Sequence, residues 1–207
     1  MEIQFYGANT IKISNKKTSI VVDDNLADLG LKQVATTKDI VVSTGDIEPL
    51  AGAHFTVNQP GEYEVADVSI QGIPARSHMD EEKGLSTTMY RIILDGVRIV
   101  VTGHIHPNLS DTQLEALGTV DILLLPVGGN GYTLDGVGAQ RVVKEIEPKV
   151  IIPTHYDDSK INYEVPQAPL EDVLKSLAME VVDTVDSLKL KNFDLGEGTK
   201  LIVINRQ

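Results

Sequence analysis

Residues 121–157 read DILLLPVGGNGYTLDGVGAQRVVKEIEPKVIIPTHYD, and this stretch decides the fold that the sequence predicts. It holds two short apolar runs, Val120–Pro126 and Val150–Pro153, on either side of a helical pattern at Gly136–Ile146. This order predicts a strand, a helix and a second strand parallel to the first. Because α/β sheets bind ligands beyond the carboxyl ends of their strands, His155 stands where a functional site is expected.

Composition limits the class of protein. A chain of 207 residues with 42% hydrophobic content predicts one domain over residues 1–207, with pseudo-repeat halves of about 1–95 and 96–207. The formal charge of −12 disfavours nucleic acid and anionic membrane surfaces as partners. Cysteine is absent, which excludes disulfides and thiolate metal sites. Because the sequence has no signal-peptide pattern and no apolar run of membrane-spanning length, we expect a cytoplasmic protein. The sequence leaves open whether the protein forms a homo-oligomer.

The rest of the chain is rich in strands. Residues 2–24 alternate apolar and polar positions, and Asp39–Thr44 forms an apolar strand that enters the loop Gly45–Pro49. Asp95-Gly96 is typical of a two-residue hairpin turn, and Ser110 is placed to cap a helix at Asp111–Leu117. Strands with helices at irregular spacing predict two packed sheets with helices outside them.

Histidines supply the main chemical signal. Three of the five follow predicted strands directly, and such loops tend to meet at one edge of a sheet protein: His78, His104 and His155. Three neutral imidazoles with one open position are the usual protein contribution to a catalytic zinc site. The competing interpretation is that each is a separate loop histidine bonded to backbone or water, and His54 and His106 are expected to be surface or hydrogen-bonded residues.

Other site chemistries find no motif. The sequence has no Gly-x-Ser-x-Gly elbow and no phosphate-binding Gly-x-x-x-x-Gly-Lys loop. The run Gly128-Gly129-Asn130-Gly131 lacks the spacing of a dinucleotide-binding loop, so it reads as a tight turn whose amides could still line a pocket. We expect the pocket to be formed by Asp46, Asp80, Gly128, Gly129, Tyr132, Thr133 and Tyr156.

Four blocks of the sequence resemble a branch of the metallo-β-lactamase superfamily, the small metal-dependent hydrolases akin to L-ascorbate-6-phosphate lactonase. The resemblance implies an α+β fold, the four-layer αββα sandwich of two mixed sheets flanked by helices, with a metal site at one edge of the sheets. The blocks are Gln59-Pro60-Gly61-Glu62-Tyr63-Glu64-Val65, Leu125-Pro126-Val127-Gly128-Gly129, Tyr132-Thr133-Leu134-Asp135 and Glu147-Pro148-Lys149-Val150-Ile151-Ile152-Pro153-Thr154-His155-Tyr156.

The sequence departs from this family at the metal ligands. Where the superfamily carries His-x-His-x-Asp-His, this chain reads Thr44-Gly45-Asp46-Ile47-Glu48-Pro49-Leu50. The family's Gly-His-Ser turn reads Gly7-Ala8-Asn9, and its Gly-Asp at a strand end reads Gly103-His104. His78 and His155 stand at two of the family's ligand positions. The resemblance therefore implies a scaffold that has lost most ligands of a two-metal site.

Three functions follow as alternatives. The first is a catalytically degenerate member that binds a small-molecule ligand or a partner. The second is an active hydrolase of a lactone, ester or phosphoester, with one zinc on His78, His104 and His155 and with Asp46, Asp80 or Glu48 as a further partner. The third is a scaffold subunit of an oligomer. No zinc or other cofactor is certain from the sequence, and the sequence identifies no substrate.

Overall fold

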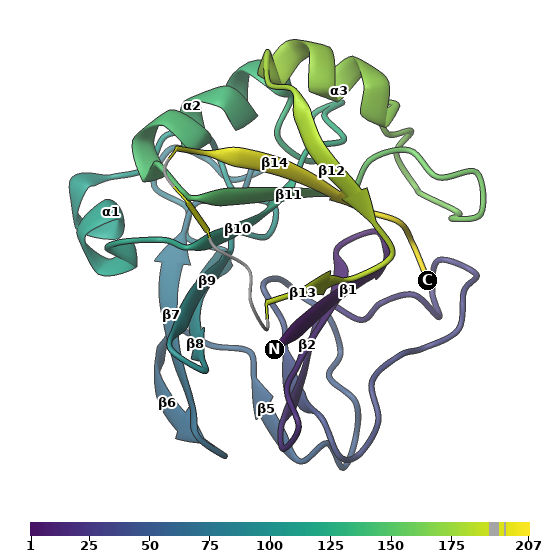
Figure 1. Cartoon of the computed structure of the whole chain (residues 1–207), viewed down its shortest axis with the longest axis vertical. Helices are drawn as coiled ribbons and strands as arrows, with labels where there is room; N and C mark the ends of the chain where they lie inside the picture. The colour runs from purple at the N-terminus through teal and green to yellow at the C-terminus, as the bar shows by residue number, and fades with distance from the viewer. Residues whose placement is uncertain (191–194, 197) are drawn as a thin grey trace.

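A computed structural model describes residues 1–190, 195–196 and 198–207, and it arranges them as two packed β-sheets with three helices (Figure 1). The first sheet has six strands in the order β13-β1-β2-β3-β4-β5. These strands are β1 (Glu2–Gly7), β2 (Thr10–Ser14), β3 (Ser19–Val22), β4 (Ile40–Val42), β5 (Phe55–Val57) and β13 (Leu188–Lys189).

The second sheet has eight strands in the order β12-β14-β11-β10-β9-β8-β7-β6. Strands β6 to β9 pair antiparallel, and β9, β10, β11, β14 and β12 pair parallel. The strands are β6 (Gly61–Val65), β7 (Val68–Ala75), β8 (Thr87–Leu94), β9 (Val97–Val101), β10 (Ile122–Pro126), β11 (Val150–Thr154), β12 (Val181–Val185) and β14 (Lys200–Ile204).

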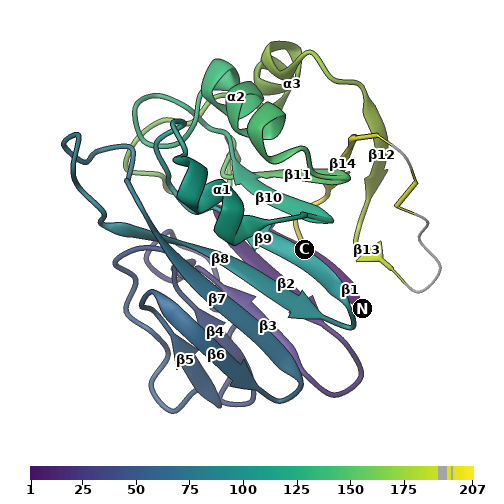
Figure 2. The same ribbon diagram turned by 90° about the vertical axis from the view of Figure 1, so that its left-hand side faces the viewer.

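Three helices cover the outer face of the eight-stranded sheet (Figures 1 and 2): α1 (Asp111–Leu117), α2 (Gly136–Ile146) and α3 (Leu170–Leu177). Helix α1 begins where predicted, because the Ser110 side chain accepts a hydrogen bond from the Gln113 backbone amide and the Gln113 side-chain oxygen accepts one from the Ser110 backbone amide. Helix α2 is capped by Asp135 and ends at Glu147, whose φ of 51° is left-handed. The strand, helix and parallel strand predicted for residues 121–157 are confirmed.

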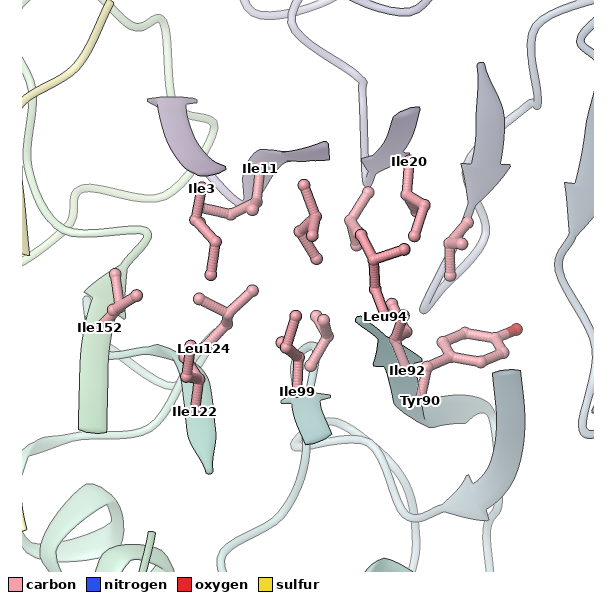
Figure 3. Close-up of a cluster of buried hydrophobic side chains, with 14 of the residues drawn as sticks. Ile3, Ile11, Ile20, Tyr90, Ile92, Leu94, Ile99, Ile122, Leu124 and Ile152 are labelled. Atoms are coloured by element: carbon pink, nitrogen blue, oxygen red, sulfur yellow. The ribbon is translucent and has the colours of Figure 1, made fainter. Parts of the chain in front are cut away.

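The main core lies between the two sheets (Figure 3). Ile3, Ile11 and Ile20 of the six-stranded sheet face residues such as Ile99 and Leu124 of the eight-stranded sheet, and all five side chains are fully buried. Burying one such side chain contributes roughly 1.5–3 kcal/mol relative to leaving it exposed. The strands of both sheets are therefore anchored in one buried apolar core.

The outer face of the six-stranded sheet is covered by loops in the described part of the chain. Val21 and Val41 pack there against Ala35, and Leu50 adds partly buried contact. Residues 25–38 form turns and irregular backbone. The α+β class with two mixed sheets and flanking helices is confirmed.

Two further expectations can be placed on the fold. The predicted division into pseudo-repeat halves near residue 95 falls at the turn between β8 and β9, inside one sheet, and the division stays a prediction. Over the residues that the structure describes, every helix is too short or too polar to cross a membrane.

Candidate functional site

A cavity of about 340 Å³ opens at the edge where loops of both sheets meet. Each contributing loop follows a strand, so the parallel and antiparallel pairings described above bring distant residues together. Its walls are formed by Asn9, Asp23, Asn25, Thr44, Gly45, Asp46, Ile47, Ser77, Ser86, Thr87, His104, Tyr132 and His155.

Asp23 anchors one wall of this cavity. One carboxylate oxygen accepts a hydrogen bond from the Thr44 amide at 2.7 Å, and the other accepts from the Thr44 hydroxyl at 2.7 Å and from the Asn9 side-chain amide at 2.5 Å. Burial raises the pKa of Asp23 to about 6, because these neutral donors offset the loss of water only in part. The Thr154 hydroxyl donates to the Asn9 oxygen and so ties this network to β11.

Two histidine rings in the cavity wall pack edge to face. The rings of His104 and His155 lie 4.7 Å apart between centroids and are nearly perpendicular, at 89°. Burial, helped by the neighbouring histidines, lowers the pKa of His104 to about 3. Burial also lowers the pKa of His155 to about 4, although a hydrogen bond to Gln167 acts in the opposite direction. Both imidazoles are therefore uncharged at neutral pH.

Gln167 determines which nitrogen of His155 is free. The Gln167 amide nitrogen donates to the Val165 carbonyl at 2.6 Å, so its oxygen is the atom that faces His155 Nδ1 at 3.2 Å. His155 Nδ1 must then carry the proton, which leaves Nε2 as an acceptor. The His155 amide donates to the Ala8 carbonyl at 2.7 Å, and the residue has a left-handed φ of 55°.

Gly128 leaves the space that the side chain of Gln167 and the backbone of His155 occupy. A Cβ atom there would lie 2.0 Å from the Gln167 side-chain oxygen and 2.2 Å from the His155 carbonyl oxygen, so only glycine fits. Thr133, predicted to line the pocket, is fully buried and accepts a hydrogen bond from the Gly129 amide at 2.7 Å. Gly128, Gly129 and Thr133 thus shape the loop beside His155 and are not among the cavity's lining residues.

A second cavity of about 210 Å³ adjoins the first, and tyrosine rings contact His155 in its wall. The ring of Tyr132 lies 4.7 Å from that of His104 and 5.7 Å from that of His155, and Tyr163 lies 5.0 Å from His155. The smaller cavity is lined by Asn25, Asp28, Leu29, Tyr132, His155, Asn162, Tyr163, Glu164, Val165 and Gln167. The two cavities therefore share Asn25, Tyr132 and His155.

His78 does not join the pair of histidines in the cavity wall. Its amide donates to the His104 carbonyl at 3.0 Å, and Ser77 forms a bridge with Ile105, so the two loops run side by side. The His78 ring stacks instead on that of His106, with centroids 6.3 Å apart. The structure thus brings together two of the three histidines predicted to hold zinc.

The metal centre implied by the sequence resemblance can be tested against these side chains. In residues 1–190 and the described residues beyond them, no three His, Asp or Glu side chains are grouped so that they could hold a metal ion. Both oxygens of Asp23 already accept hydrogen bonds, and Asp46 stands at the exposed rim. The arrangement therefore does not fit a metal centre, and the three-histidine zinc site stays a prediction.

The remaining predicted pocket residues have separate positions. Asp80 accepts hydrogen bonds from the Ser77 amide and from the amide and hydroxyl of Ser86, and these bonds lower its pKa. It therefore organises the loop after β7. Tyr156 packs on Phe5, with ring centroids 5.7 Å apart, at the edge of the main core. Of the seven predicted pocket residues, Asp46 and Tyr132 line the larger cavity.

Sequence reasoning missed Asp23, Asn9, Thr44 and Gln167. A signal for the first existed, because Asp23 ends a strand-like run and the end of a parallel strand is a site position. Its position beside Thr44 depends on the parallel pairing of β3 with β4, which no local pattern in the sequence reveals. Gln167 lies in an irregular loop and carries no comparable signal.

Comparison with known proteins places the chain in a family. A model of the beta-lactamase superfamily domain matches residues 2–155, which is most of the chain. The chain belongs to this superfamily. A solved structure from Thermotoga maritima, named provisionally as a Zn-dependent hydrolase of the metallo-beta-lactamase superfamily, has a TM-score of 0.73 at 24% identity and covers 99% of this chain and 98% of that one. It supports the superfamily fold.

Two curated relatives of this superfamily member carry the name UPF0173 metal-dependent hydrolase. The protein from Archaeoglobus fulgidus is 27% identical over 150 residues, which cover 69% of this chain and 62% of that protein. The protein from Pyrococcus furiosus is 29% identical over 142 residues, which cover 65% of this chain and 62% of that protein. The matches thus span less than two thirds of either relative's length.

Proposed function

We propose that this superfamily member binds a small polar ligand in the cavity at the sheet edge without a two-metal centre. The observation that carries the proposal is the network around Asp23, in which Thr44 and Asn9 satisfy the carboxylate by hydrogen bonds alone. Thr44 opens the segment that departs from the family's ligand motif. A cavity of about 340 Å³ with several converging polar groups is of the size and kind that bind small molecules.

This proposal includes the degenerate character of the chain. The segment Thr44–Pro49 supplies hydroxyl, carboxylate and apolar side chains where the resemblance implies imidazoles. A hydrolase that relies on a metal-activated hydroxide needs a complete ligand set. The likeness to L-ascorbate-6-phosphate lactonase, the cytoplasmic location, the homo-oligomer and the exclusion of nucleic acid and membranes all stay predictions.

A second candidate is the activity in the relatives' names, metal-dependent hydrolysis. The specific observation in its favour is the close pair of uncharged imidazoles, His104 and His155, since neutral histidine nitrogens are common metal ligands. The predicted third ligand, His78, would have to leave its stack with His106. The names of the relatives imply a metal but identify no site in this chain.

Ligand binding to metal-free protein separates the two candidates. Protein stripped with a chelator is screened by thermal shift against small polar compounds, with and without added zinc, and metal content is measured before stripping. The first candidate predicts stabilisation by ligand in the absence of zinc. Stoichiometric metal in the untreated protein, together with ligand stabilisation that occurs only when zinc is present, would overturn it in favour of the second.

Two matched variants test whether the stabilising ligand binds in this cavity. His104→Phe replaces a ring in the cavity wall by one of similar size that lacks nitrogens, and we expect ligand stabilisation to be lost. His54→Phe makes the same change just before β5, at a position that does not line the cavity, and should leave the response intact. Equal responses in the two variants would show that the ligand binds elsewhere.

A further inference from the structure

The charges around the two adjoining cavities have one sign. Of the described residues that line the larger cavity, the charged ones are Asp23 and Asp46, and lysine and arginine are missing. The smaller cavity adds Asp28 and Glu164 and likewise has no lysine or arginine among its described lining residues. An anionic ligand entering here would lose hydration without gaining a cationic partner, which is costly.

The neutral polar groups in the same walls are arranged to accept hydrogen bonds. His155 lines both cavities and is 4% exposed, and the Gln167 oxygen fixes its proton on Nδ1, so Nε2 is left as a hydrogen-bond acceptor. The Thr44 hydroxyl donates to Asp23 and so offers only lone pairs outward. A ligand that carries several N–H donors would satisfy these groups.

Aromatic faces stand at the same junction. Tyr132 contacts His104 and His155, and Tyr163 contacts His155 from the side of the smaller cavity. The electron-rich faces of such rings attract cations by roughly 0.5–2 kcal/mol, depending on exposure to water. The chain's overall charge of −12 adds a long-range attraction for cations.

A third cavity shows the opposite character. It measures about 420 Å³ and is lined in part by Lys12, Lys32 and Arg206. Lys12 is paired with Asp39 and Arg206 with Asp158, but the cavity still has basic side chains on its walls. Anions therefore have a more favourable surface elsewhere on the same molecule.

From these observations we propose that the ligand of the two adjoining cavities is a small organic cation, an ammonium compound, and that anions such as phosphates and carboxylates are rejected. It is recognised by the carboxylate of Asp46, by Nε2 of His155 and by the faces of Tyr132 and Tyr163. The buried carboxylate of Asp23, whose oxygens are already hydrogen-bonded, contributes only the attraction of its charge. This inference rests on the proposed metal-free ligand site and narrows its ligand class.

Matched probes test the charge preference. Metal-free protein is titrated with benzylammonium, putrescine and choline, and with benzyl alcohol and benzoate as neutral and anionic counterparts of the first probe. Binding is followed by NMR through the imidazole signals of His104 and His155. We expect at least one ammonium probe to shift both signals saturably, at least tenfold more tightly than either counterpart.

A charge-removing variant tests the recognising group. Asp46→Asn keeps the shape of the rim but removes its charge, and a single ion contact at a partly solvated site predicts a roughly threefold to tenfold loss of ammonium affinity. Glu48→Gln removes a nearby exposed charge that does not line the cavity and should change affinity less than twofold.

The outcomes are distinguishable from those of the proposed function. Saturable benzoate binding at His104 and His155, as tight as that of the ammonium probes, would overturn the cation preference while leaving a metal-free ligand site in place. Failure of all three ammonium probes to shift these signals would also overturn it. Failure of every compound in the broader thermal screen without zinc would instead remove the proposed function.

Discussion

Two buried carboxylates, Asp23 and Asp121, lie at opposite ends of the strands and have opposite partners. Asp121 precedes β10, at the amino end of the parallel strands, and its oxygens accept hydrogen bonds from the Arg98 guanidinium at 2.9 and 3.2 Å and from the Lys149 ammonium at 2.9 Å. Asp23 follows β3 at the cavity, and the hydrogen bonds that its carboxylate accepts from the described residues come from uncharged groups of Thr44 and Asn9.

The two pKa values express this difference. Burial works against ionisation of Asp121, but the hydrogen bonds and charges of Arg98 and Lys149 outweigh it and lower the pKa to about 2. At Asp23 burial prevails and raises the pKa to about 6. The ion cluster at Asp121 stabilises the fold, whereas Asp23 retains a charge at a cost to stability. Such an arrangement is typical of a functional site.

The largest effect is expected from Asp23→Asn. Because the folded-state pKa lies above the ordinary value of 3.8, the proton stabilises the native state at low pH, and this contribution is lost as the pH rises through about 6. Between pH 4 and pH 7 the stability of the variant should rise relative to that of the native protein by roughly 2 kcal/mol. Urea unfolding at a series of pH values measures this difference.

Absolute stability is not the readout for Asp23→Asn, since the new amide would face the Asn9 amide. The variant Asp46→Asn is the control, because its carboxylate is exposed at the rim of the same cavity. If the stability difference between Asp23→Asn and the native protein does not change with pH, the description of Asp23 as an uncompensated buried charge is wrong.

A smaller effect is expected from Asp121→Asn. Loss of charge-assisted hydrogen bonds to Arg98 and Lys149 should lower the free energy of unfolding by about 2 kcal/mol at neutral pH. Since the folded-state pKa is lowered, this contribution is present above pH 4 and is lost as the pH falls through about 2. The difference measured by urea unfolding should therefore shrink in acid. A constant difference down to pH 2 would contradict the ion-cluster assignment.

The smallest effect is expected from Lys149→Met. The lysine side chain is 39% exposed, so solvent screens its attraction to Asp121, and Arg98 remains as a second cation. The predicted loss of stability is under about 1 kcal/mol, measured by urea unfolding at neutral pH and repeated in high salt. A loss as large as that of Asp121→Asn would mean that Lys149 alone compensates the carboxylate.

Local features of the fold were predictable from sequence. The Ser110 capping box and the apolar period of Gly136–Ile146 predict the bounds of α1 and α2, because these elements depend on residues three or four positions apart. The apolar runs of β10 and β11 likewise predict buried parallel strands. The pairing of β3 with β4 was not predictable in this way, because the two strands are separated by a long irregular segment.

The candidate site was predicted only in part. His104 and His155 follow strands, and strand order alone brings their rings together. His78 also follows a strand, but the pairing of its loop with that of His104 leaves its ring against His106, which no spacing rule predicts. Asp46 and Tyr132 line the cavity. Thr133 is buried by a hydrogen bond within its own loop, and Tyr156 packs on Phe5, which is distant in the sequence.

The sequence by itself determined the strands, the helices and the edge at which the chemistry gathers, since periodicity and capping are local properties. Only the tertiary structure decided which side chains share a cavity and what charge surrounds them. Asp23, Thr44 and Asn9 meet through pairing between separate strands, and Gln167 reaches His155 because Gly128 leaves room for it. Burial and partners, and hence the charge state of each group, exist only once those contacts have formed.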